Sequence, residues 1–293
     1  MSERLPGLRH VERTMGTVFS FDIRDTRTPA VETALVEAVS WLHRVDEVFS
    51  TYRPDSAVSR LARGELDLDD CPAEVREVLG LCEQVEHATG GWFSVTANGS
   101  LDPTGLVKGW AVERAAQILK AAGARHLCVN GGGDLQLSGE AAPGTPWRIG
   151  IAHPLRPGDL CTVVTGRDLA VATSGTAERG AHILDPHTGA PATGPASVTV
   201  VGRGLTTTDA YATAAFAMGA GARDWLEGLD GHEGFAVAAD GGMWHTRDFP
   251  GTVCDVVRRG HLRDEEPPSG STARSRLWAA TRPRRSAAAP RRR

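Results

Sequence analysis

The chain has 293 residues, a formal net charge of −4 and ordinary proportions of apolar (41%) and charged (23%) side chains. These values are typical of a soluble globular protein with one large domain or two smaller ones, and they exclude a fibrous or wholly disordered chain. No apolar run approaches the ~20 residues of a membrane-spanning helix. The N-terminal residues contain neither the apolar segment of a signal peptide nor a lipid-attachment cysteine, so we expect a cytoplasmic protein.

Charge is unevenly distributed along the chain. Residues 261–293 hold nine arginines and three acidic side chains, a net charge of +6, which leaves −10 for the remainder. The same stretch is rich in Pro, Ser, Ala and Gly, a composition typical of disorder. We therefore predict a folded domain over residues 1–258 and a disordered tail over 259–293. Arg291–Arg293 could contact nucleic acid or anionic lipid, but a solvated tail is the simpler interpretation, so no nucleic-acid partner is expected.

The cysteines do not form a recognisable framework. There are five, an odd number, and no Cys-x-x-Cys pair occurs among them. A disulfide scaffold or a zinc site would need paired spacing. The sequence therefore predicts buried free thiols in a reducing compartment.

Helical patterns dominate the first half of the chain. Alternation over 17–23 predicts a strand, and Pro29 opens an amphipathic helix whose apolar stripe continues to Phe49. A polar loop and a short helix around residues 58–61 follow. Pro72 then opens a further helix that ends at Thr89-Gly-Gly91.

The stretch from Asp102 to Gly123 combines a turn with a helix. Asp102-Pro-Thr-Gly105 has the residues of a tight turn, and the apolar spacing after it is helical up to Gly123, a typical left-handed C-cap. A turn that leads into a helix N-terminus leaves backbone N–H groups free for an anion. Lys108 adds a positive charge, and only Lys120 shares its residue type in this arginine-rich chain. A solvated lysine on a surface helix is the alternative interpretation.

The second half of the chain is rich in strand patterns. These cover residues 125–129, 135–137, 147–152, 161–165, 169–172, 197–201, 234–238 and 243–245. One helix interrupts them, predicted from Asp209 to Met218, with the hydroxyls of Thr206–Thr208 as its N-cap. Helices concentrated in the first half and strands in the second predict the α+β class, with mixed or antiparallel sheets and packed helices.

Asp209 and Thr213 are four residues apart on that helix, so their oxygens share one face. A carboxylate beside a hydroxyl suits Mg²⁺, which takes a few protein oxygens and completes its shell with water and phosphate. The alternative is that Asp209 is a first-turn acid stabilised by the helix dipole.

A glycine run lies between two predicted strands, at Asn130-Gly-Gly-Gly-Asp134. Glycines let the backbone approach a ligand closely, although the run could equally be a plain hairpin connection. It is not a dinucleotide-binding fingerprint, because no Gly-x-Gly-x-x-Gly opens a helix after a strand.

A polar loop offers candidate acid–base groups. Thr173-Ser174-Gly175 is followed by His182 and Asp185 within a dozen residues. His182 could act as a general base or orient a phosphate, but a structural role is more common for a loop histidine. Ser174 is not predicted to be a hydrolase nucleophile, because no Gly-x-Ser-x-Gly elbow surrounds it.

Taken together, these pieces resemble the FAD:protein FMN transferases, the ApbE family, from about Met15 to Ala220. The matching stretches are Met15-Gly-Thr17, Phe49-Ser-Thr-Tyr-Arg-Pro-Asp-Ser56, Thr89-Gly-Gly-Trp-Phe93, Asp102-Pro-Thr-Gly-Leu-Val-Lys-Gly109, Asn130-Gly-Gly-Gly-Asp134, Thr173-Ser-Gly175 with His182-Ile-Leu-Asp-Pro-His-Thr-Gly189, and Asp209-Ala-Tyr-Ala-Thr213. Seven stretches in one order over some two hundred residues make coincidence a poor explanation.

The resemblance implies a two-lobed, T-fold-like architecture and a Mg²⁺-dependent enzyme. It would transfer FMN from FAD onto a threonine or serine hydroxyl of a target protein and release AMP. The positions that match FAD contacts in the family are Met15, Tyr52, Trp92, Phe93, Ser94, Asp102, Lys108 and Ile183. The positions that match the magnesium ligands are Gly105, through its carbonyl, with Asp209 and Thr213.

A mechanism follows from this resemblance. Mg²⁺ and Lys108 would offset charge on the pyrophosphate, and the target hydroxyl would attack the FMN-side phosphorus. His182 is the candidate acceptor of the hydroxyl proton, with Asp185 as the competing candidate. Tyr52 would pack against a ring of FAD.

Two positions depart from the family pattern. Ser94 stands where relatives usually have Asp, and Glu113 stands where many have Asp. Many relatives are exported lipoproteins, so without a signal the acceptor would be cytoplasmic. Two rival functions share the site: an FAD pyrophosphatase, in which water replaces the acceptor hydroxyl, and an FAD-binding protein without turnover, which the missing Asp makes conceivable.

Overall fold

The computed structural model describes residues 7–176, 180 and 183–258, with side chains described as far as Thr252. The helices are α1 (Pro29–Phe49), α2 (Ala57–Ala62), α3 (Ala73–Ala88), α4 (Thr104–Ala121), α5 (Leu205–Met218) and α6 (Ala222–Glu227). The strands are β1 (Leu8–Thr14), β2 (Thr17–Ile23), β3 (Leu127–Gly131), β4 (Asp134–Ser138), β5 (Trp147–Ala152), β6 (Asp159–Gly166), β7 (Ala170–Gly175), β8 (Pro195–Gly202), β9 (Glu233–Ala238), β10 (Met243–His245) and β11 (Gly251–Arg258).

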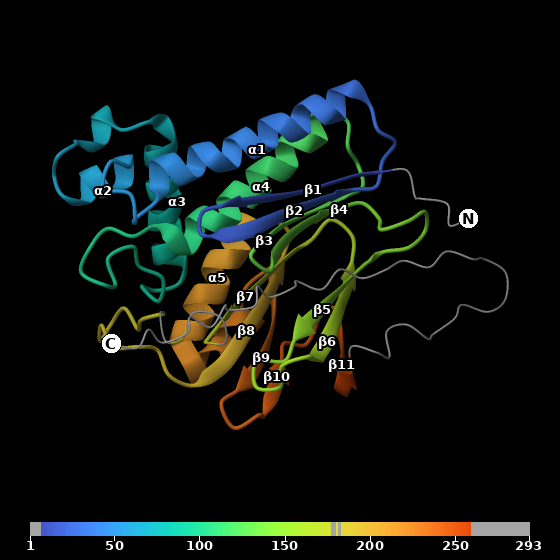
Figure 1. Cartoon of the computed structure of the whole chain (residues 1–293). Helices are drawn as coiled ribbons and strands as arrows, with labels where there is room; N and C mark the ends of the chain where they lie inside the picture. Colours follow the sequence, from blue (N-terminus) through green and yellow to red (C-terminus); the bar gives the residue numbers. More distant parts are fainter. Residues whose placement is uncertain (1–6, 177–179, 181–182, 259–293) are drawn as a thin grey trace, which may run out of the picture. The chain divides into compact units, whose positions relative to one another are not determined.

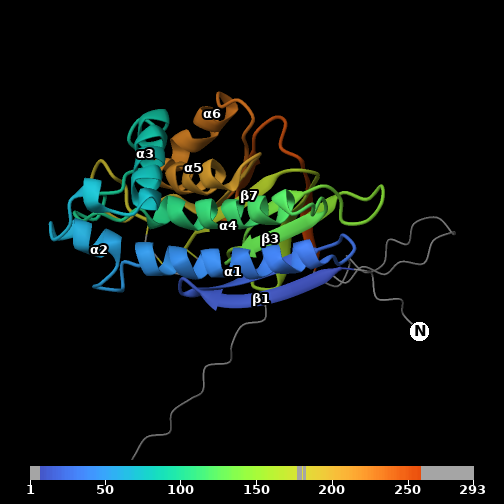
Figure 2. The same ribbon diagram turned by 90° about the horizontal axis from the view of Figure 1, so that it is seen from above.

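The larger sheet has eight strands in the order β1-β2-β3-β4-β7-β8-β9-β10, and every neighbouring pair is antiparallel. Helices α1, α4 and α5 lie side by side on one of its faces (Figures 1 and 2). Each helix buries an apolar face against its neighbours or the sheet, which forms the main core. In α1 the stripe from Val31 to Phe49 supplies eight buried side chains.

The smaller sheet has three strands in the order β11-β6-β5. A second apolar cluster joins it to the other face of the larger sheet. Ile151, Cys161 and Val164 come from the smaller sheet, and Val171 and Phe235 come from the larger one. The domain therefore has three layers: helices, a broad antiparallel sheet and a small sheet (Figure 1). The α+β class predicted from the sequence is confirmed.

Most predicted elements occur with small shifts at their ends, and β2, β5 and β10 have the predicted bounds. Among the α-helices and β-strands, three were not predicted: β1, β11 and the short helix α6. β1 is an edge strand whose sequence, LRHVERT, is polar on both faces and so lacks the alternation that marks a strand.

The predicted start of α5 was wrong. The helix begins at Leu205, so Thr206–Thr208 lie inside its first turn and are not its N-cap. The hydroxyls of Thr207 and Thr208 instead donate back to the Gly204 carbonyl, at 3.3 and 2.7 Å. Asp209 is consequently in the second turn, away from the helix end where the dipole would stabilise it.

The thiols of Cys71, Cys82, Cys128 and Cys161 are all free, as predicted, and Cys128 is half-buried while the others are buried. Burial is also the main reason that the pKa of Cys82 is raised to about 12. Within the described residues, no helix is both long and apolar enough to cross a lipid bilayer.

Candidate active site

The site forms where α4 and α5 lie close together, and Gly109 permits that close approach. A Cβ atom at Gly109 would lie 2.5 Å from the carbonyl oxygen of Leu205 and 2.8 Å from the Cβ of Asp209. The Gly109 amide also donates to Asp209 Oδ2 at 3.0 Å. The glycine thus lets one helix backbone bind the carboxylate of the other directly.

Lys108 lies between two buried carboxylates. Its Nζ donates to Asp209 Oδ2 at 2.8 Å and forms a second ion pair with Asp134 Oδ2. The lysine side chain is half-buried at 20% exposure, and both acids are buried. One positive charge therefore faces two negative charges in a region of low dielectric, which leaves a net negative charge at the site.

The pKa values of this cluster reflect that imbalance. Burial opposes the charge on Lys108, but the two carboxylates outweigh it and raise the pKa of Lys108 above its usual range. Burial raises the pKa of Asp209 to about 6, Asp134 adds to the rise, and Lys108 offsets only part of it. The raised pKa of Lys108 indicates a strong ion pair, whereas the raised pKa of Asp209 indicates a weakly compensated carboxylate. The difference arises because Lys108 has two partners, whereas Asp209 shares one lysine with a second acid.

Asp134 belongs to this candidate site through its ion pair with Lys108, although the sequence predicted no role for it beyond the end of the glycine run. That run forms the β3–β4 hairpin turn, with φ of +63° at Gly132 and +105° at Gly133. The other carboxylate oxygen of Asp134 accepts from the Thr173 amide at 2.8 Å. Asp134 thus ties β4 to β7 as well as holding Lys108. The glycine run is therefore a hairpin connection, and a close approach of its backbone to a ligand stays a prediction.

The predicted magnesium ligands lie near one another. Thr213 follows Asp209 by one helical turn, and a Cβ at Gly105 would lie 3.8 Å from the Thr213 methyl group. Ser174 Oγ, on β7, is 3.4 Å from Thr213 Oγ1. In the described part of the chain, no three His, Cys, Asp or Glu side chains gather into a metal-binding group. A hard cation here would rely on one carboxylate plus hydroxyl and carbonyl oxygens, and the excess negative charge fits such a cation.

The segment from Thr89 to Ser94 borders this region. Phe93 is buried, and its ring would lie 3.1 Å from a Cβ at Gly105. Trp92 makes an edge-on contact with the His187 ring at a centroid distance of 4.5 Å. Ser94 Oγ lies 3.3 Å from Thr96 Oγ1. The aromatic side chains of this segment thus connect the Gly105 turn to the loop that holds His187.

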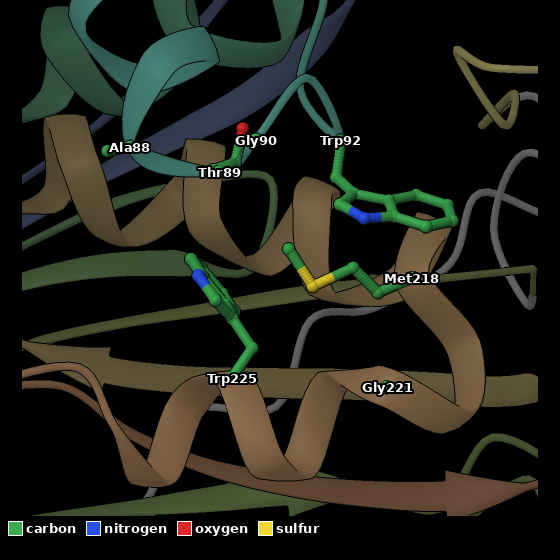
Figure 3. A pocket seen from close by; sticks show the side chains of 7 residues that line it. All are labelled: Ala88, Thr89, Gly90, Trp92, Met218, Gly221 and Trp225. Atoms are coloured by element: carbon green, nitrogen blue, oxygen red, sulfur yellow. The ribbon is translucent and has the colours of Figure 1, made fainter.

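A pocket of about 310 Å³ opens on one side of Trp92 (Figure 3). Met218 and Trp225 also line it, with the Met218 side chain between the two tryptophans in this view, and the backbone near Thr89 and Gly90 completes the lining. Trp225 is held edge-on against Tyr211 of α5, with ring centroids 5.4 Å apart. The pocket therefore offers a largely apolar, aromatic surface.

Asp185 organises its own loop. Its carboxylate oxygens accept from the His187 amide and the Thr188 hydroxyl, both at 2.9 Å. The His187 hydrogen bond is also the main reason that the pKa of Asp185 is lowered. Ile183, two residues earlier, is buried. His182, the other predicted base, lies outside the described residues.

The remaining predicted FAD contacts lie on three turns. Met15 occupies the β1–β2 turn with φ of +49°, a strained backbone for a residue other than glycine. That turn adjoins the glycine hairpin, since a Cβ at Gly132 would lie 2.8 Å from Thr17 Oγ1. Asp102 Oδ1 accepts from the Thr104 amide at 3.0 Å, which shapes the turn before α4. Tyr52 is 97% exposed beyond the end of α1.

Comparison with known proteins agrees with the resemblance to the ApbE family that the sequence motifs indicated. A sequence model of the ApbE family matches residues 15–102 and 97–236. The FAD:protein FMN transferase of Vibrio cholerae is 28% identical over 268 residues, covering 70% of this chain and 80% of that protein. That of Rhodobacter capsulatus is 31% identical over 205 residues, covering 67% of this chain but only 35% of that protein.

Solved structures of the same family share the fold. The flavin transferase ApbE from Vibrio cholerae has a TM-score of 0.69 and 22% identity, covering 82% of this chain and 97% of that one. The apo form of the Pseudomonas stutzeri flavinyl transferase ApbE has a TM-score of 0.72 and 23% identity, covering 82% and 95%. With the family match spanning most of the chain and the Lys108 site at its centre, the protein belongs to the ApbE family.

Proposed function

We propose that this protein is a Mg²⁺-dependent flavin transferase that moves FMN from FAD onto a threonine or serine hydroxyl of a target protein, through a phosphoester bond, and releases AMP. The observation that carries the proposal is the buried cluster of Lys108, Asp134 and Asp209, whose excess negative charge adjoins Thr213 and Gly105. The relatives named FAD:protein FMN transferase supply the substrate class.

Within this proposal, Asp209, Thr213 and the Gly105 carbonyl hold the magnesium ion. When bound there, the ion supplies Lewis-acid neutralisation of the pyrophosphate oxygens. Asp134 keeps Lys108 charged and fixed beside Asp209, so the ammonium can donate to a phosphate oxygen without leaving the site. The lysine thereby lowers the cost of negative charge on the departing AMP.

The acceptor hydroxyl attacks the FMN-side phosphorus, the bond from that phosphorus to the oxygen of AMP breaks, and a base takes the hydroxyl proton. His182 is our preferred base. Asp185 is the weaker candidate, because its lowered pKa and its two hydrogen bonds within the loop make it a poor proton acceptor.

The pocket beside Trp92 is our proposed seat for one ring system of FAD, because aromatic walls stack on flat rings. Trp225→Ala should then raise the dissociation constant for FAD about tenfold, measured by flavin fluorescence, while AMP release at saturating FAD changes little. Trp244→Ala, on the edge strand β10, is the matched control. Unaltered FAD affinity in the Trp225 variant would place the ring elsewhere.

One experiment separates the transferase from its rivals. The protein is incubated with FAD and Mg²⁺, with and without cytoplasmic extract, and both AMP and flavin fluorescence on denatured protein bands are recorded. AMP together with a labelled band is expected. AMP without any labelled band would favour an FAD pyrophosphatase, and bound FAD with neither product would favour a binding protein.

A further inference from the structure

Helix α5 carries Asp209 and Thr213 but does not cap its own N-terminus. Gly204 precedes it and has no side chain to offer, and the first turn contains no acidic residue. The hydroxyls of Thr207 and Thr208 donate to the Gly204 carbonyl, and no side chain of the first turn accepts from the first amides. Those amides need acceptors from elsewhere in the molecule.

Two distant side chains supply these acceptors. Glu113 Oε2, from α4, accepts from the Thr206 amide at 2.8 Å and from the Thr206 hydroxyl at 2.7 Å. Gln136, from β4, accepts from the Leu205 amide at 2.9 Å and donates to the Arg203 carbonyl at 3.1 Å. The negative charge of the glutamate also suits the positive end of the helix dipole.

Helix α4 and strand β4, which supply these acceptors, also carry the groups that bind Asp209 and Lys108. On α4, Glu113 is one turn beyond Gly109, whose amide binds Asp209. On β4, Gln136 is two residues beyond Asp134 and so on the same face of the strand, and Asp134 holds Lys108. The start of α5 is therefore fixed to the two elements against which Asp209 must be aligned.

We propose that Glu113 and Gln136 are positioning residues. They fix the rotation of α5 about its axis and its position along that axis, so that Asp209 and Thr213 face Lys108 and the metal site. A carboxylate with two hydrogen bonds to one residue fixes that residue more firmly than a local cap would. Gly204 leaves room for this carboxylate, because a Cβ there would lie only 3.1 Å from both Glu113 oxygens. The metal-binding part of this inference rests on the proposed function.

The test compares Glu113→Ala with Glu113→Gln, which keeps an acceptor oxygen, and with Arg114→Ala, an exposed neighbour on α4. We expect Glu113→Ala to raise the Mg²⁺ concentration for half-maximal AMP release by about tenfold or more, as loss of an outer-shell partner does. Turnover should recover at saturating Mg²⁺, and the KM for FAD should change less. Glu113→Gln should restore most of the affinity, and Arg114→Ala should match the parent protein.

Hydrogen–deuterium exchange without metal or FAD gives a readout independent of activity. The amides of Leu205 and Thr206 should exchange faster in Glu113→Ala and keep their protection in Arg114→Ala. Should Glu113→Ala fail to fold, Gln136→Met removes the second cap at similar volume and makes the same prediction.

The two hypotheses fail differently. A parent protein without Mg²⁺-dependent AMP release would overturn the proposed function, while amide exchange would still test the capping. An active parent whose Glu113→Ala or Gln136→Met variant shows unchanged half-saturation by Mg²⁺ and unchanged exchange at the start of α5 would overturn the positioning role.

Discussion

Asp209 has to serve two partners, a lysine already shared with Asp134 and the proposed cation. Burial already disfavours the ionised Asp209 carboxylate, and Lys108 would keep Asp134 as its partner, so removal of the Asp209 charge should lower the free energy of unfolding little. We predict that Asp209→Ala stays folded and loses Mg²⁺-dependent AMP release by about a hundredfold or more, as expected when an electrostatic contributor to the transition state is removed. Circular dichroism and AMP release check this, with the exposed Asp230→Ala as control. Full activity in the folded Asp209 variant would remove this residue from the metal site.

The raised pKa of Asp209 predicts a pH dependence with a definite sign. In the folded protein the carboxyl holds its proton up to a pKa of about 6, against an ordinary value of 3.8. Its contribution to the free energy of unfolding is therefore fully present below the ordinary pKa and is lost as the pH rises through the folded one. Without metal, stability from this group should fall between about pH 4 and pH 6.5.

Mg²⁺ requires the ionised carboxylate, so its affinity should rise over the same pH window. Urea unfolding of the metal-free protein at several pH values measures the first effect, and Mg²⁺ titrations of FAD binding measure the second. Asp209→Asn, which cannot titrate, is the control and should show neither slope. Identical pH profiles for the parent protein and this variant would contradict the assignment.

At the scale of elements, the contact of α4 with α5 depends on one missing side chain. Gly109→Ala would place a methyl group 2.5 Å from the Leu205 carbonyl oxygen, and neither backbone can yield easily. We predict a loss of about 1–3 kcal/mol of stability from this overpacking and a larger Mg²⁺ requirement, because α5 must move away.

Gly80→Ala is the matched control for that prediction. Gly80 lies within α3, and a Cβ there meets nothing within 4 Å. This substitution should raise stability by roughly 0.5–1 kcal/mol, since alanine is the better helix residue. Chemical denaturation of both variants decides the matter, and equal effects at the two glycines would refute the close-contact argument.

The sequence predicted those elements whose signals are local. The apolar stripe of α1 and the alternation in β2 each record a single buried face, and both elements were found at their predicted bounds. The start of α5 was misplaced because its caps, Glu113 and Gln136, lie 93 and 69 residues away in the sequence. No local pattern contains that information.

The candidate site likewise contains some residues that local motifs predicted and others that only the fold brings together. The motifs that contain Lys108 and Asp209 were evident in the sequence, but their ion pair joins residues 101 positions apart. Asp134 received no role because its partners, Lys108 and Thr173, come from α4 and β7. The positive φ of Met15 is likewise a property of the folded β1–β2 turn.

For the molecule as a whole, the layered architecture fixes the site by joining helices to strands. Lys108 and Asp209 come from the helical layer, whereas Asp134 and Ser174 come from the eight-stranded sheet beneath it. The second apolar cluster supports the opposite face of that sheet and so holds β7 in place. Ligands that bridge helices and sheet should therefore stabilise the entire domain rather than one loop.

This coupling predicts a joint effect of FAD and Mg²⁺ on thermal stability. A ligand at a hundred times its dissociation constant adds about 2.7 kcal/mol to the free energy of unfolding, which raises Tm by roughly 5–10 °C for a domain of this size. Because the pyrophosphate and Asp209 would share the cation, FAD should shift Tm more with Mg²⁺ than with EDTA.

Thermal unfolding with each ligand alone and with both together measures the effect, and Asp209→Ala should abolish the extra shift while keeping any shift due to FAD alone. Equal FAD shifts with Mg²⁺ and with EDTA in the parent protein would mean that the metal does not contact the substrate. The cluster around Lys108 would then be a structural ion pair, and the negative charge that it leaves uncompensated would need another explanation.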